Sequence, residues 1–189
     1  MLIEALCRIG IESKSLLDVG CGIGSVHLTL LNRGASSAQG VEISEAMLEE
    51  SRKLAGEMGL ETRVRYHRGD IVYSNGSLEL SDVSIVDKVV CCYPDFELLL
   101  GKLVSKTRTC VAISYPRDSW LSRLVFKGMQ RLGTFLRWSF HPYYHEPIAI
   151  DGVLAAKGFE ERFNGVTIIW QAKVFLREGT IPATIGPAG

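Results

Sequence analysis

The sequence has no pair of cysteines separated by two residues, which is the spacing of many structural zinc sites. Its five cysteines are Cys7, Cys21, Cys91, Cys92 and Cys110, and its four histidines do not complete a zinc-binding spacing with them. An odd number of cysteines without a secretory leader favours reduced, mostly buried thiols. We therefore expect neither a metal site nor a disulfide framework.

Long apolar runs and an excess of charge of one sign are also missing. No run approaches the roughly 20 apolar residues that cross a bilayer, and the N-terminus lacks the basic and apolar regions of an export signal. The formal net charge is +0 and the pI is about 6.9, which gives no indication of a nucleic-acid partner. We expect a cytoplasmic protein.

The 189 residues contain 47% hydrophobic and 22% charged side chains, as is usual for a globular domain. Residues 178–189 contain glycine and proline without periodicity, and we expect them to form a disordered tail. The remaining residues, 1–177, are expected to form one domain.

Strand-like and helix-like segments alternate along this domain. The expected strands cover residues 15–19, 37–44, 62–70, 81–92, 109–115, 159–164 and 166–176. The expected helices cover residues 2–9, 25–32, a segment capped by Ser44, 96–104, 120–138 and 148–157. The alternation predicts an α/β fold, with a Rossmann-like, doubly wound, mostly parallel seven-stranded sheet. The last two strands are expected to form an antiparallel hairpin around Asn164-Gly165.

The stretch "LLDVGCGIGS" (Leu16–Ser25) places three glycines directly after the first expected strand. It is not a phosphate-binding loop, because no Lys-Ser or Lys-Thr follows, and the third glycine of the dinucleotide fingerprint is missing. The turn is expected to leave free amides at a helix start, with the carboxylate of Asp18 at its mouth. An acid there would repel a pyrophosphate and suit a ligand that carries an ammonium and a sulfonium.

The same stretch resembles motif I of the class I S-adenosylmethionine-dependent methyltransferases. "GVEIS", "RGDIV" and "VVCCYPD" follow in the order of the later motifs. The resemblance implies S-adenosyl-L-methionine as cofactor, with Glu42 on its ribose and Asp70 against its adenine. The cofactor-binding residues implied by the motifs are Asp18, Gly20, Cys21, Gly22, Gly24, Glu42, Ile43, Asp70, Ile71, Cys92 and Tyr93.

The second half of the chain is similar to a group of small methyltransferases that are distantly similar to magnesium-protoporphyrin O-methyltransferases. This resemblance implies a small-molecule acceptor. One alternative function is that of a non-catalytic cofactor-binding protein or partner subunit. Another is that of a nicotinamide-dependent oxidoreductase, which the incomplete dinucleotide fingerprint disfavours. Methylation of nucleic acid is disfavoured by the neutral charge and by the absence of an Asn/Asp-Pro-Pro-Tyr/Phe motif.

Two cysteines, Cys91 and Cys92, end the fourth expected strand. On a strand their thiols would point to opposite faces, so we expect packing rather than a shared ligand. Tyr93 and Asp95 then follow, either at the rim of the active site or as parts of a turn.

The expected helix over residues 120–138 carries an apolar stripe, which includes Leu124 and Met129, and a basic one. The basic stripe, Arg123, Lys127 and Arg131, is either a solvated face or a surface that attracts an acidic, amphipathic substrate; membrane-surface contact is not favoured. His141, Tyr144 and His145 follow, and we predict that at least one of them acts on the acceptor.

Overall fold

In the computed structural model, residues 1–74, 78–120, 123–125, 128–129, 131 and 143–180 are described. The helices are α1 (Leu2–Ile9), α2 (Ser25–Asn32), α3 (Glu45–Glu57), α4 (Phe96–Ser105) and α6 (Pro147–Ala155). The strands are β1 (Ser15–Val19), β2 (Ser37–Glu42), β3 (Val64–Arg68), β4 (Ser81–Asp87), β5 (Thr107–Pro116), β6 (Phe159–Val166) and β7 (Trp170–Arg177). Short 3₁₀ turns occur at Glu61–Arg63, Ile71–Tyr73 and Val90–Cys92.

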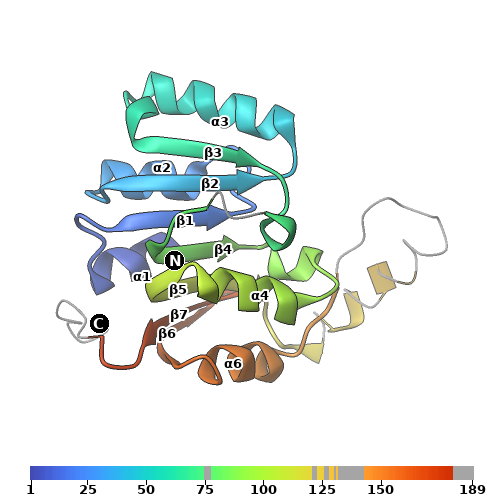
Figure 1. Ribbon diagram of the computed structural model, residues 1–189. Helices are drawn as coiled ribbons and strands as arrows, with labels where there is room; N and C mark the ends of the chain where they lie inside the picture. The colour runs from blue at the N-terminus through green and yellow to red at the C-terminus, as the bar shows by residue number, and fades with distance from the viewer. Residues whose placement is uncertain (75–77, 121–122, 126–127, 130, 132–142, 181–189) are drawn as a thin grey trace.

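The strands form one seven-stranded sheet in the order β3-β2-β1-β4-β5-β7-β6 (Figure 1). Strands β1 to β5 are parallel, and β7 pairs antiparallel with both β5 and β6. This arrangement confirms the predicted Rossmann-like sheet with an antiparallel C-terminal hairpin. The order reverses between β1 and β4, and ligands of such sheets bind at the carboxyl ends of the strands beside this point.

Helices cover both faces of the sheet and bury two apolar layers. One layer packs against α1, α2 and α3 and includes Leu6, Leu30 and Ile85, while the other packs against α4 and α6 and includes Leu103 and Phe175. Successive residues of β5 and β7 alternate between the two layers, as the period of a strand requires. The two layers hold the carboxyl ends of the parallel strands at one edge of the sheet.

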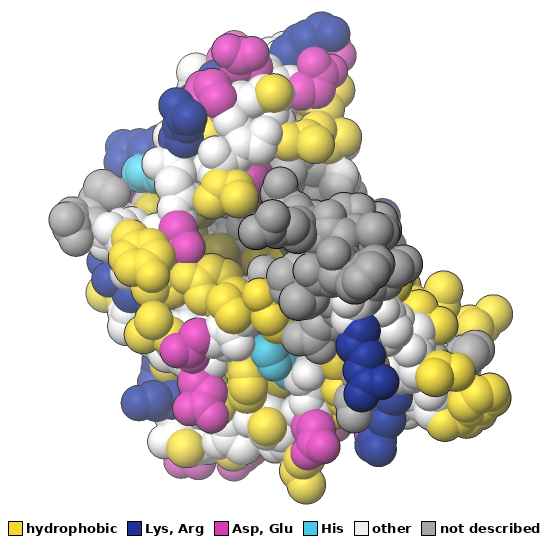
Figure 2. Space-filling view, turned by 90° about the vertical axis from the view of Figure 1, so that its right-hand side faces the viewer, with side chains coloured by type: hydrophobic (Ala, Val, Ile, Leu, Met, Phe, Trp, Pro, Cys, Tyr) yellow, Lys and Arg dark blue, Asp and Glu magenta, His cyan; other side chains and the backbone are white. Residues whose placement is uncertain are grey.

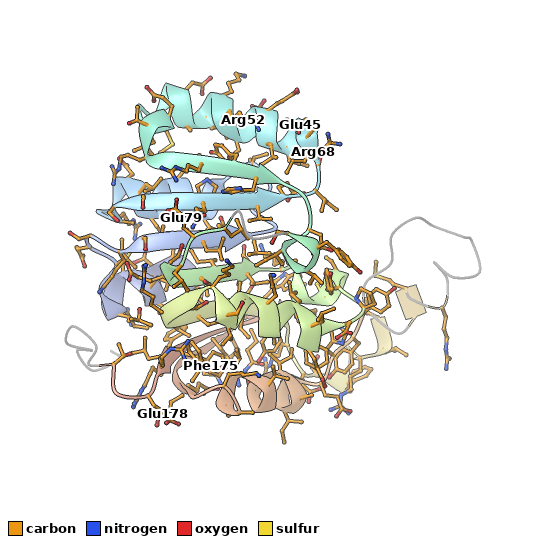
Figure 3. The ribbon with its side chains drawn as sticks, viewed as in Figure 1. Glu45, Arg52, Arg68, Glu79, Phe175 and Glu178 are labelled. Carbon is orange, nitrogen blue, oxygen red and sulfur yellow. The ribbon has the colours of Figure 1, made fainter. Side chains whose placement is uncertain are left out.

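Helix α3 begins as the sequence predicts, because the hydroxyl of Ser44 accepts a hydrogen bond from the Met47 amide. At the outer edge of the molecule, Glu45 contacts both Arg52 and Arg68 (Figure 3). These exposed ion pairs join α3 to the end of β3 without contributing to the core.

The fourth strand is shorter than predicted. It ends at Asp87, because Lys88 takes a left-handed conformation with φ of 61°. The Lys88 amide bonds to the carbonyl and the hydroxyl of Ser114, and a 3₁₀ turn over Val90–Cys92 follows. The prediction of a strand as far as Cys92 was therefore wrong.

The hairpin turn predicted at Asn164-Gly165 is also wrong. These residues lie inside β6, where Gly165 pairs with Ala172, and the turn lies at Thr167–Ile169. Thr167 and Trp170 close it with mutual hydrogen bonds. The space at Gly165 is tight: a Cβ atom there would lie 2.8 Å from Met1 Sδ and from the Phe163 ring, so these side chains would have to shift.

The predicted helix over residues 120–138 lies largely outside the described residues. Its described side chains Leu124, Val125 and Met129 are exposed, so the predicted core-facing stripe is not buried at these positions. The predicted disordered tail lies outside the described residues from 181 onward. In the described part of the chain, no helix is long and apolar enough to span a membrane.

Candidate active site

A cavity of about 650 Å³ opens at the carboxyl ends of β1, β2 and β4. It is lined by Val19, Gly20, Val41, Glu42, Ile43, Gly69, Asp70, Ile71, Tyr73, Val89, Cys92, Tyr93, Pro94, Asp95, Leu98 and Leu99. Figure 2 faces this end of the sheet, where hydrophobic side chains gather across the middle of the view. Among the described residues, the charged side chains that line the cavity are three acids, Glu42, Asp70 and Asp95.

The glycine turn forms one wall of the cavity. Gly20, Gly22 and Gly24 have φ values of 67°, 54° and 85°, which favour glycine. A Cβ atom on Gly20 would lie 2.3 Å from Val89 Cγ2, so this position also requires glycine for close packing. Around Gly22 no atom lies within 4 Å of a Cβ position, and the turn is open there.

The first amides of the turn are not free, contrary to the sequence prediction. The amides of Gly20 and Cys21 both donate to the carbonyl of Val41, at 2.8 and 3.1 Å. The Gly22 amide donates to Glu42 Oε2 at 3.0 Å. These bonds fix the turn against the end of β2, so the turn offers shape and an oriented carboxylate to a ligand rather than a row of free donors.

Glu42 lies at the end of β2, between the glycine turn and α3. Its two oxygens accept the amides of Gly22 and Ser44, each at 3.0 Å. A carboxylate oxygen can accept more than one hydrogen bond. Glu42 is therefore held in place by the backbone and can still accept hydrogen bonds from a ligand in the cavity.

Asp18 does not lie at the mouth of the turn, and this prediction was wrong. Its side chain is 2% exposed and lies 2.8 Å from Nδ1 of His27, which is itself buried. His27 Nε2 lies 3.4 Å from the hydroxyl of Tyr66, which is also hydrogen-bonded to Ser51. Asp18 thus belongs to a polar network beneath the turn. Cys21, Gly22 and Gly24 also do not line the cavity, although all three belong to the turn.

Asp70 follows β3 and uses both of its oxygens. One accepts the Val72 amide at 2.9 Å, and the other accepts the Tyr93 hydroxyl at 2.8 Å. Burial, followed by the hydrogen bond to Asp70, raises the pKa of Tyr93 above its ordinary value. The contact joins the segments after β3 and β4 across the cavity, and no local pattern predicts it.

The segment after β4 forms the far wall of the cavity. Asp95 lines the cavity and also caps α4, accepting the Leu98 amide at 3.0 Å. Asp95 therefore both lines the cavity and shapes the turn that leads into α4. Apolar lining residues that sequence reasoning missed are Tyr73, Val89, Pro94, Leu98 and Leu99. Val89 and Pro94 lie within VVCCYPD, and the other three follow a motif by a few residues, where periodicity alone assigns them to the core.

Two of the three residues predicted to act on the acceptor are described, and they make different contacts. The Tyr144 hydroxyl donates to Asp118 at 2.6 Å, and Asp118 also forms a double contact with Arg123. His145 Nε2 lies 2.8 Å from the carbonyl oxygen of Tyr93, which lines the cavity, whereas His145 itself does not line it. His141 lies outside the described residues.

The described residues contain no cluster of three or more His, Cys, Asp and Glu side chains that could hold a metal ion.

Residues 16–109 match the sequence profile of a family described as a methyltransferase domain. A rice protein (Oryza sativa subsp. japonica) named as a probable chloroplastic tocopherol O-methyltransferase is 34% identical over 72 residues, 36% of this chain and 20% of the relative. The ribosomal protein L11 methyltransferase of Deinococcus radiodurans is 28% identical over 122 residues, 56% of this chain and 45% of the relative. The chain therefore spans less than half the length of these two relatives.

The fold is similar to that of solved methyltransferases. The crystal structure of magnesium protoporphyrin IX methyltransferase from Synechocystis PCC 6803 with bound SAH superposes with a TM-score of 0.76 at 21% identity, covering 94% of this chain and 80% of that chain. The matched profile covers the glycine turn, Glu42 and Asp70, and the fold continues through β7. Residues 16–109 therefore form a methyltransferase domain, and the chain has the fold of the solved S-adenosylmethionine-dependent methyltransferases.

Proposed function

We propose that this protein is an enzyme that transfers a methyl group from S-adenosylmethionine to a small apolar or amphipathic molecule. The observation that carries the proposal is the cavity beside the reversal of strand order, with Glu42 and Asp70 at the ends of two neighbouring strands. Acids in these places fit a ligand with ribose hydroxyls and an adenine amino group.

The residues present fit this donor in shape and in charge. At Gly22 and Gly69 a Cβ position would meet only open space, which leaves room for a ligand to approach the backbone closely. Three carboxylates line the cavity, which suits a ligand that carries an ammonium and a sulfonium. When bound, S-adenosylmethionine supplies an electrophilic methyl group, so the protein has mainly to position the acceptor and exclude water.

The acceptor is proposed to bind through an apolar, uncharged part. The side chains of Tyr73, Pro94 and Leu98 line the outer part of the cavity, and Tyr73 and Leu98 are exposed. An acidic acceptor was expected from the basic stripe, but Arg123 is already bound to Asp118 and Tyr144. Lys127 lies outside the described residues. An acidic acceptor therefore has less support than an apolar one.

His145 is the described side chain best suited to accept a proton from the acceptor. A carbonyl oxygen can only accept, so the contact with Tyr93 requires a proton on Nε2 of His145. In the neutral ring this leaves Nδ1 unprotonated and able to act as a base. The Tyr144 hydroxyl, in contrast, already donates to Asp118.

The proposal is tested by incubating the purified protein with cell extract and donor labelled in its methyl group. We expect a labelled small molecule to accumulate, and much less of it with His145→Gln. Donor binding without any labelled product would favour the alternative of a non-catalytic subunit. A labelled protein or nucleic acid in place of a small molecule would contradict the acceptor class.

We also propose that the protein acts in the cytoplasm.

A further inference from the structure

Two thiols lie side by side at the wall of the cavity. Cys91 and Cys92 belong to the 3₁₀ turn between β4 and α4, and their Sγ atoms are 4.0 Å apart. Both Sγ atoms lie 3.4 Å from the carbonyl oxygen of Lys88, which can accept a hydrogen bond from either thiol. The proximity contradicts the sequence prediction, because that prediction assumed a strand, on which the two thiols would diverge.

The two thiols differ in their access to the cavity. Cys91 is 4% exposed and does not line the cavity, whereas Cys92 is partly exposed and does. The hydrogen bond from Cys91 lowers the pKa of Cys92, which favours its thiolate. A ligand that enters the cavity therefore meets Cys92 first and finds Cys91 within reach behind it.

The geometry decides between the reactions of such a pair. Neighbouring Cα atoms are about 3.8 Å apart, which is closer than the roughly 4.4–6.8 Å usual across a disulfide. A direct bond between the sulfurs would therefore be strained. A single atom that bonds both sulfurs relieves this strain, because the sulfurs then stay beyond bonding distance of each other. The described residues place no third metal ligand beside the pair.

We propose that Cys91 and Cys92 form a dithiol site, at the wall of the cavity, that binds trivalent arsenicals. In the reaction with an organic arsine oxide, R–As=O, two arsenic–sulfur bonds form and the arsenic–oxygen bond breaks. Both thiol protons leave with the oxygen as one molecule of water. Arsenic remains trivalent, so the step needs neither an oxidant nor a reductant.

The adduct would occupy the cavity from the side of Cys92. It should therefore prevent donor binding, and this consequence alone rests on the proposed function. The site itself is independent of methyl transfer and has its own readout.

The test uses the full chain and phenylarsine oxide as the probe. Intact-protein mass spectrometry should show one phenylarsenic group gained with the loss of two hydrogen atoms. Peptide mapping should find Cys91 and Cys92 both protected from alkylation. 2,3-Dimercaptopropanol should reverse the adduct, and a monothiol should not.

Single variants supply the control. Cys91→Ser keeps a hydroxyl that can donate to the Lys88 carbonyl, and it should weaken probe binding by roughly 100-fold or more, since the second bond is lost. Cys110→Ser, which changes a buried thiol elsewhere in the sheet, should bind the probe like the wild type. If Cys91→Ser does not fold, the alkylation map of the wild type decides alone.

Protection of other cysteines, or unchanged binding by Cys91→Ser, would overturn the site. If the adduct forms and donor binding is unchanged, the dithiol site does not lie at the wall of the donor cavity. If the unmodified protein binds no donor at all, the proposed function fails, while the mass and alkylation data still decide the dithiol site.

Discussion

The carboxylate of Asp18 lies 2.8 Å from Nδ1 of His27, and both side chains are buried directly beneath the glycine turn. The packing around them is tight, since a Cβ atom on Gly24 would lie 2.3 Å from Ser51 Oγ and 2.9 Å from the His27 ring. The acid of the glycine motif therefore supports the turn from below, whereas Glu42 and Asp70 line the cavity.

Replacement of His27 by leucine should destabilise the fold, because it leaves the Asp18 carboxylate buried without its partner. Breaking a buried pair in this way costs about 3–5 kcal/mol. The double variant Asp18→Asn/His27→Leu should recover part of this loss, since no charge remains to be buried. Urea unfolding of the single and double variants measures both effects. A loss below about 1 kcal/mol for His27→Leu would show that the pair is not a supporting contact.

Replacement of Glu42 by alanine should weaken donor binding by roughly 1.5–3 kcal/mol, since charge-assisted hydrogen bonds to the ribose are lost. Glu42→Gln keeps an oxygen that can accept one of the two amides, so its melting temperature should stay closer to that of the wild type. Glu45→Gln is the matched control, because Glu45 pairs with Arg52 and Arg68 away from the cavity (Figure 3). Equal donor affinity in Glu42→Ala and in the control would exclude Glu42 as the ribose acid.

Alanine substitutions at Gly20 and Gly22 should have different consequences. At both positions φ is positive, which costs roughly 1–2 kcal/mol for an L-residue. Gly20→Ala adds a clash with Val89 and should destabilise the protein well beyond this value. Gly22→Ala meets only open space, so it should fold and lose donor affinity. Melting curves and donor titrations of both variants separate the effect on stability from the effect on binding. Equal melting temperatures for Gly20→Ala and Gly22→Ala would contradict the close packing at Gly20.

The architecture could be predicted from the sequence because it follows from local patterns. Buried strands alternate with helices, and caps such as Ser44 act within a few residues. Glu42 and Asp70 could be placed because both end parallel strands, which meet at one edge of the sheet. The turn of the hairpin could not be placed, because β6 continues through Gly165 after a register shift between Glu161 and Phe163, and Gly165 packs beside Met1 from the other end of the chain.

Contacts between side chains that are far apart in sequence were equally out of reach. The Asp70–Tyr93 and Asp18–His27 hydrogen bonds join different elements, and nothing in the spacing of these residues signals them. The left-handed conformation of Lys88 ends β4 early, and this single residue brings the thiols of Cys91 and Cys92 together.

The pKa of Asp118 offers a pH-dependent test of the contacts that join Arg123 and Tyr144. Hydrogen bonds from Arg123 and then Tyr144 lower this pKa to about 2, from an ordinary value of 3.8. Because this pKa is lower in the folded state, the contact stabilises the folded state above pH 3.8. Its contribution to the free energy of unfolding disappears as the pH falls toward 2. Arg123→Gln should return the pKa toward 3.8, as followed by NMR titration of the carboxyl carbon. No change in this pKa would contradict the double contact.

Calorimetric titration of the purified protein with S-adenosylmethionine, its demethylated product, NAD and ATP tests the central claim most directly. The cavity is lined by three carboxylates, and the glycine turn uses its first amides internally. The account therefore predicts that S-adenosylmethionine and its product bind, and that NAD and ATP bind far more weakly because their phosphates meet acids. Binding of NAD or ATP that is as tight as binding of S-adenosylmethionine would contradict it.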